Sequence, residues 1–256
     1  MNFLYCFQSE WLKTRRSLSA WLVILGAFFT PIIVTSAKLV RSENLRAESV
    51  SPKFWENLWT SSWESIAILL LPLGLILATS LVTQIEFKNN AWKQTLTTPQ
   101  SLTTIYFAKL AVIVMMMVQF FVLFDIGVYL SGVVPGLLTR GVRYPQEAIP
   151  YLFFLKQEMR YFADCLPILG LEYLVSLQSS NFLVPVGGGI GLWIASLSVL
   201  NWKYGYLFPY TYLGLNYFRV MGRYTASTPI HLWAMGYFVV FVTAGYILFL
   251  MKRQKG

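Results

Sequence analysis

Charged side chains are scarce in this sequence. Asp, Glu, Lys and Arg make up 12% of the 256 residues, whereas hydrophobic residues make up 56%. An ordinary soluble domain carries about 25% charged residues. The composition therefore excludes an ordinary soluble domain and indicates a membrane protein.

Histidine and cysteine are nearly absent. The chain has one histidine, His231, and two cysteines, Cys6 and Cys165. Zinc sites and Ser-His-Asp triads draw on these residue types, so the sequence offers no metal cluster and no convincing hydrolytic site. Cys6 would face the reducing side of a membrane, and we expect no disulfide. The nucleotide-binding pattern G-x-x-x-x-G-K-[ST] is also missing, so we expect no ATPase activity in this chain.

Long uncharged runs are what the sequence has instead. A helix of about 20 apolar residues crosses a bilayer, and the runs predict an all-α polytopic membrane protein with six transmembrane helices. The polar cluster Gln178-Ser179-Ser180-Asn181 divides the fourth span from the fifth. Because Asp164 and Glu172 are costly to insert, an alternative with five spans and 161–178 in the interface stays open. The six spans are placed at about 18–39, 65–85, 103–131, 161–178, 182–201 and 230–251.

Basic residues close to the span ends set the orientation. They are dense, with few acids, in the short segments before the first span and after the last, which contain Arg15-Arg16 and residues 252–255. This predicts a protein of the cell membrane with both termini in the cytoplasm. The net charge of +9 then reflects topology, and no nucleic-acid partner is expected.

Aromatic residues mark the segments expected on the outer side. Trp55, Trp59 and Trp63 recur every four residues, which is typical of a short helix lying in the aromatic belt at the lipid headgroups. Residues 202–229 are rich in Tyr and Phe and poor in charge, and they predict a re-entrant segment. Residues 132–150, with several Gly and Pro, predict an exposed connection. His231 is expected to be an interfacial polar residue.

Two amphipathic segments are expected on the inner side. Residues 2–16 predict a helix lying along the membrane surface, with apolar residues on one face and basic ones on the other. Residues 86–98 predict a second short helix, which Pro99 ends because proline cannot donate a backbone hydrogen bond. Ser101 or Thr103 can cap the helix that follows. The pattern alone leaves two interpretations of 86–98, a docking surface or a solvated interfacial loop.

Two carboxyl groups are expected inside the membrane, at Asp125 and Glu172. Such groups usually face a bundle interior or a water-filled cavity. They are candidates for a substrate or proton contact, or for hydrogen-bonded structural carboxyls. Asp164 is expected at the outer interface.

The residues around 86–98 resemble the first cytoplasmic loop of type-2 ABC transporter permeases, and most closely the lantibiotic-immunity and bacitracin-resistance permeases. Residues ahead of the first span are similar to the elbow helix of that family. One departure is that Asn89-Asn90-Ala91 stands where the family has a glycine. The residues that carry the resemblance are Glu86, Asn90, Trp92, Lys93, Pro99, Ser101 and Lys109 in the loop, and Glu10, Trp11, Lys13 and Arg15 in the elbow.

The resemblance implies a permease subunit of an ABC exporter for a hydrophobic or amphipathic compound such as a peptide antibiotic. It implies a separate P-loop ATPase subunit that uses the ATP, no cofactor in this chain, and a second permease that is identical or a sister chain. An alternative is a secondary transporter or channel that uses Asp125 and Glu172 as a relay. The ATPase contacts that the resemblance implies are Glu86, Phe87, Asn90, Trp92, Lys93 and Leu96.

Overall fold

The structure is a computed structural model that describes residues 3–40, 51–88, 101–139, 145, 147–225 and 228–254, without the side chains of 86–88 and 252–254. Every regular element in these ranges is a helix. The elements are α1 (Phe3–Arg15), α2 (Leu18–Val40), α4 (Phe54–Ser65), the π-helix η1 (Ile66–Leu70), α5 (Leu71–Lys88), α7 (Leu102–Leu138), α8 (Tyr151–Gln178), α9 (Leu183–Val199), the 3-10 helices η2 (Gly205–Leu207) and η3 (Pro209–Thr211), α10 (Tyr212–Val220) and α11 (Ile230–Gln254).

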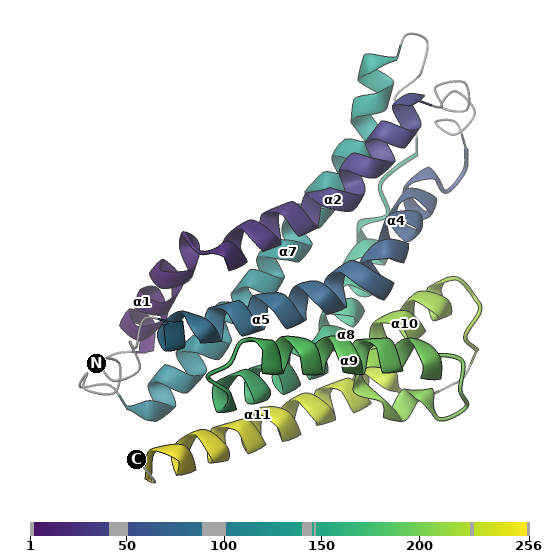
Figure 1. Cartoon of the computed structure of the whole chain (residues 1–256). Coiled ribbons are helices and arrows are strands. Elements are labelled where there is room, and N and C mark those ends of the chain that lie inside the picture. The colour runs from purple at the N-terminus through teal and green to yellow at the C-terminus, as the bar shows by residue number, and fades with distance from the viewer. Residues whose placement is uncertain are drawn as a thin grey trace.

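The long helices run side by side along one axis (Figure 1). Helix α8 packs against α5, α9, α10 and α11, while α7 packs against α1 and α2. The N-terminal helix α1, the last turn of α5, the start of α7 and the end of α11 lie at one end of the bundle, and α10 lies at the other (Figure 1). The chain therefore has an end that holds both termini, called the inner end below, and an opposite outer end.

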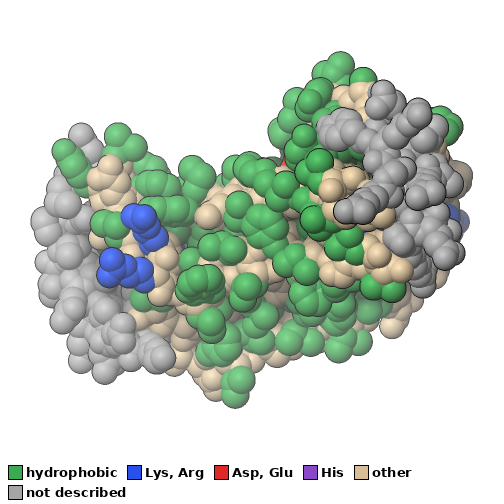
Figure 2. Space-filling model, turned by 90° about the horizontal axis from the view of Figure 1, so that it is seen from above, with side chains coloured by type: hydrophobic (Ala, Val, Ile, Leu, Met, Phe, Trp, Pro, Cys, Tyr) green, Lys and Arg blue, Asp and Glu red, His purple; other side chains and the backbone are tan. Residues whose placement is uncertain are grey.

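Four helices are long and apolar enough to cross a membrane. Figure 2 shows a face that is largely covered by hydrophobic side chains, as a lipid-facing surface requires. The observations confirm a helical, multi-pass membrane protein. The four helices are Leu18–Val40, Phe54–Ile85, Leu102–Leu138 and Ile230–Met251.

Two further helices occupy the positions of the predicted fourth and fifth spans. Helix α9 is apolar but has only 17 residues. Helix α8 has 28 residues, five of them charged, and its side chains Glu158, Asp164 and Glu172 are buried. These three acidic groups point into the bundle, so α8 can occupy the position of a predicted span although it is less apolar than the other long helices. Six spans remain a prediction.

The three tryptophans were expected to contact the lipid headgroups, but they are buried inside the bundle. Helix α4 continues through η1 into α5 without a break, and the exposed fractions of Trp55, Trp59 and Trp63 are 1%, 1% and 0%. The ring of Trp63 stacks on that of Tyr161 with centroids 3.8 Å apart. The tryptophans are buried because α7 and α8 supply aromatic partners, and each indole N–H has an acceptor: Glu158 of α8 for Trp59 and Trp63, and the backbone carbonyl of Glu147 for Trp55.

The connection after the third span is shorter than predicted. Helix α7 continues to Leu138, and α8 begins at Tyr151, ten residues before the predicted fourth span. A Cβ atom at Gly132 would lie 2.6 Å from the Trp55 ring. This glycine therefore permits close packing of α7 on α4 and does not mark a turn.

The outer segment 202–229 contains η2, η3 and α10. Its residues Tyr210, Leu213 and Tyr217 are buried in the main hydrophobic core. The aromatic density of this segment thus serves packing against the long helices. Its insertion into the membrane remains a prediction.

Candidate functional site

Helix α1 is anchored on the inner end of α7. Cys6 of α1 packs against Ile105 and Ala108 of α7, and all three are buried. Helix α7 begins at an N-cap, where the Ser101 hydroxyl accepts a hydrogen bond from the Thr104 backbone N–H at 3.1 Å. Of the two caps that the sequence allows, Ser101 is the one used.

A buried ion pair ties the two helices together. The Lys109 ammonium of α7 donates to the Glu10 carboxylate of α1 at 2.5 Å, and Lys13 donates to the other oxygen at 2.5 Å. Lys109 and Glu10 are 2% and 4% exposed. Burial raises the pKa of Glu10, but the ammonium groups of Lys109 and Lys13 outweigh it and hold that pKa below its ordinary 4.5. The carboxylate is therefore charged at neutral pH.

The ion pair links α1 to α7 close to the start of α7. Lys109 lies eight residues after Ser101, which is about 12 Å along a helix. The other predicted elbow residues lie on the same helix, with Trp11 stacked on Phe7 and Arg15 exposed.

The predicted ATPase contacts fall at the same end. Glu86 and Phe87 belong to the last turn of α5. Asn90, Trp92, Lys93 and Leu96 lie outside the described residues. The predicted coupling helix 86–98 thus stays a prediction apart from the helical backbone of its first three residues.

A second polar group lies deeper, between α4, α7 and α8. The Oε1 atom of Glu158 accepts hydrogen bonds from the indole N–H groups of Trp59 and Trp63 at 3.1 and 3.2 Å. Asp125 of α7 is half-buried, and its carboxyl is a neighbour of the Glu158 carboxyl. Asp125 was expected to face the bundle interior or a water-filled cavity, and its neighbour is the Glu158 carboxyl, which the sequence did not single out.

Glu172 lies on the inner half of α8. Its Oε1 atom accepts a hydrogen bond from the Tyr210 hydroxyl at 2.5 Å, and its carboxyl lies against Gly189 of α9. Glu172 Oε2 has no hydrogen-bond partner among the described residues. The carboxyl is therefore held on one side by the outer segment and packed on the other against a glycine.

Asp164 is fully buried in α8. Its Oδ1 atom lies 2.8 Å from Nδ1 of His231, at the start of α11. The position of both residues at the outer interface stays a prediction.

The structure does not bring Asp125 and Glu172 together. Asp125 faces Glu158, and Glu158 and Glu172 are 14 residues apart on α8, which is about 21 Å along the axis. A seven-residue spacing puts Glu158, Cys165 and Glu172 on one face of α8. If the helix had been predicted to begin at Tyr151, this spacing would have placed Glu158 on the same helix face as Glu172 and made it a candidate site residue.

Comparison with known proteins identifies the family. The model of the family described as ABC-2 family transporter protein matches residues 6–196, that is 191 of the 256 residues, from within α1 to within α9. The comparisons with curated proteins and with solved structures gave no significant match. The chain therefore belongs to the ABC-2 transporter family.

Proposed function

We propose that this chain is the membrane-spanning permease subunit of an ABC exporter and takes its energy from a separate cytoplasmic ATPase. Family membership indicates a membrane component of a transporter. The inner end would be cytoplasmic, and the segment 86–98 would dock in a groove of the ATPase.

The observation that carries this proposal is the buried pair Glu10–Lys109. A buried ion pair needs good geometry to offset its desolvation, so it fixes one arrangement of the two helices. Here it fixes α1 beside the start of α7, which directly follows the proposed docking segment. ATP-driven movement of that segment would shift α7 and α1 together, and α1 would transmit the movement along the membrane surface.

The proposed substrate is a hydrophobic or amphipathic compound such as a peptide antibiotic, by resemblance to the lantibiotic-immunity and bacitracin-resistance permeases. The path would run between two permeases. In support, a Cβ atom added at Gly187, Gly188 or Gly191 of α9 would meet nothing within 4 Å. Small residues let transmembrane helices approach closely, so this side of α9 can accept a second permease.

The substitution Trp92→Ala tests the docking. Aromatic anchors of an interface commonly contribute about 2 kcal/mol or more, which corresponds to a roughly thirtyfold weaker complex. The measurement is pull-down of the ATPase by detergent-solubilised permease. Trp202→Ala is the matched control, because Trp202 is 61% exposed and belongs to the outer segment 202–229, not to the proposed docking segment. Equal capture of the ATPase by both variants would contradict the proposal.

A further inference from the structure

A polar cavity lies at the outer end of the bundle, away from the proposed ATPase side. It is formed by α4, α8 and α10 and has a volume of about 620 Å³. This falls within the roughly 300–1,000 Å³ of small-molecule sites. Neither the family match nor the proposed transport mechanism assigns a ligand to it.

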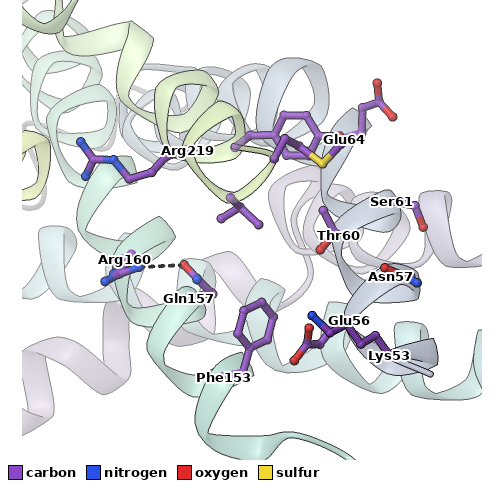
Figure 3. A pocket seen from close by; sticks show the side chains of 13 residues that line it. Lys53, Glu56, Asn57, Thr60, Ser61, Glu64, Phe153, Gln157, Arg160 and Arg219 are labelled. Carbon is purple, nitrogen blue, oxygen red and sulfur yellow. Dashed lines mark hydrogen bonds between the residues drawn. The ribbon is translucent and has the colours of Figure 1, made fainter. Parts of the chain in front are cut away.

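The cavity separates charges of opposite sign. Figure 3 shows Arg160 of α8 and Arg219 of α10 on one side, and Glu56 and Glu64 of α4 on the other. The fifth charged side chain, Lys53, lies at the end of the α4 wall (Figure 3). A ligand that carries an anion and a cation a few bonds apart would match both walls.

Arg160 is available to bind an anion. Its guanidinium donates to the neutral Gln157 amide oxygen at 3.3 Å, and no carboxylate of the described residues forms an ion pair with it. A guanidinium has five N–H donors in a planar fork that matches a phosphate. Arg219 donates to the Thr228 carbonyl oxygen at 2.9 Å and stacks over the Tyr224 ring, which holds the second cation in place.

The depth of the cavity matches the lipid headgroups. The uncharged run Ser65–Ile85 begins directly after Glu64 and is 21 residues long, which is about 31 Å of helix and close to the hydrocarbon thickness of about 30 Å. On α8, residues 161–178 follow Arg160 and cover about 27 Å. Both walls of the cavity therefore lie just beyond the hydrocarbon region.

We propose that this cavity binds the zwitterionic headgroup of a phospholipid of the outer leaflet. The phosphate lies against Arg160 and Arg219, and the ammonium lies against Glu64, while Glu56, about 12 Å away along α4, adds to the negative charge of that wall. A zwitterion satisfies both walls, whereas an anionic lipid with the same phosphate but no ammonium leaves the glutamates without a cationic partner.

Lipid retention tests the proposal. The full chain is purified in detergent with equal amounts of phosphatidylethanolamine and phosphatidylglycerol, and the bound lipid is read by native mass spectrometry. We expect retention of phosphatidylethanolamine, and about tenfold weaker retention by Arg160→Gln, the change for the loss of one charge-assisted hydrogen bond. Lys203→Gln is the control, because it removes an exposed cation outside the cavity.

A second variant does not depend on the arginine. Glu64 is exposed, so Glu64→Gln should fold normally and shift the preference from phosphatidylethanolamine toward phosphatidylglycerol. Soluble phosphorylethanolamine is added as a competitor, and its failure to displace the lipid identifies the lipid headgroup as the source of the bound group. Displacement by the soluble compound at equal concentration would overturn the lipid assignment.

Two further results would overturn the proposal. One is equal retention of both lipids by the parent chain and by Glu64→Gln. The other is retention of an added cationic amphipathic peptide in place of the lipid. The assay needs neither ATP nor the ATPase, so its failure is distinguishable from a failure of the proposed coupling function.

Discussion

Removing one partner of the Glu10–Lys109 pair should release α1 from the bundle. The substitution Lys109→Gln leaves the Glu10 carboxylate buried without its main partner. Loss of one partner from a buried pair costs about 3–5 kcal/mol. A loss of about 3 kcal/mol raises the population of undocked α1 by roughly a hundredfold, since each 1.4 kcal/mol is about tenfold.

Cys6 is a built-in reporter of this release. Its side chain is 2% exposed against Ile105 and Ala108 of α7, so a thiol reagent reaches it only when α1 undocks. The other thiol is removed with Cys165→Ala. In this background the labelling rate of Cys6 should rise about a hundredfold with Lys109→Gln, in proportion to the undocked population.

Two controls separate burial from charge. Lys13 also contacts Glu10, but its side chain is 35% exposed, and exposed pairs contribute about 0–1 kcal/mol. Lys13→Gln should therefore raise the rate less than about tenfold. The double variant Glu10→Gln/Lys109→Gln leaves no buried charge without its partner and should label more slowly than Lys109→Gln. Labelling of Lys109→Gln at the parent rate would refute the role of the pair.

Three further predictions concern the packing and charge of other elements. Gly189→Ala should lower the melting temperature, because its Cβ would lie 2.8 Å from Ile76 Cγ2. Gly187→Ala, whose Cβ meets nothing within 4 Å, should leave the melting temperature unchanged, and equal melting temperatures of the two variants would contradict the packing. Cysteines at Leu213 and Leu207, which are 0% and 42% exposed, test the outer segment with an impermeant thiol reagent. Leu213→Cys should react slowly, and slow reaction of Leu207→Cys as well would place that side chain in lipid. Fast reaction of both would contradict the structure. The folded pKa of Glu10 is lower than the ordinary 4.5, so the stabilisation of α1 is present above pH 4.5 and lost as the pH falls through the folded pKa. The hydrogen-exchange rate of the α1 amides, corrected for the intrinsic rate, should rise only below pH 4.5. A rise near pH 6 would contradict this role of Glu10.

Local signals in the sequence were sufficient for much of the fold. Helix α2 (Leu18–Val40) and helix α11, which begins at Ile230, match the predicted uncharged runs closely, because about 20 apolar residues flanked by charge have few alternatives. The turn between α8 and α9 falls on the polar cluster that begins at Gln178. The Ser101 cap was also visible, since capping depends on neighbouring residues.

Contacts between distant residues were not visible. The burial of Trp59 was not predicted because its hydrogen-bond acceptor, Glu158, is 99 residues away in sequence. Glu10 and Lys109 are also 99 residues apart, and although the resemblance singled out both residues, nothing in the sequence paired them. Glu158 fell outside the predicted span 161–178. The charged residues at the start of α8 made this part of the helix look too polar to belong to a span. The candidate site was thus predictable as a set of residues but not as a geometry.

The π-helical turn η1 sets the rotation of α4 relative to α5 about the axis of the continuous helix that they form. A π-turn within an α-helix amounts to one extra residue, and each residue of an α-helix corresponds to about 100° of rotation. Deleting one residue from Ile66–Leu70 would restore a regular helix and turn the tryptophan face of α4 about 100° away from α8. Chains that share this bundle but are one residue shorter between Glu64 and Pro72 should therefore carry their aromatic residues at shifted positions, which makes the length of this interval a marker for aligning related permeases.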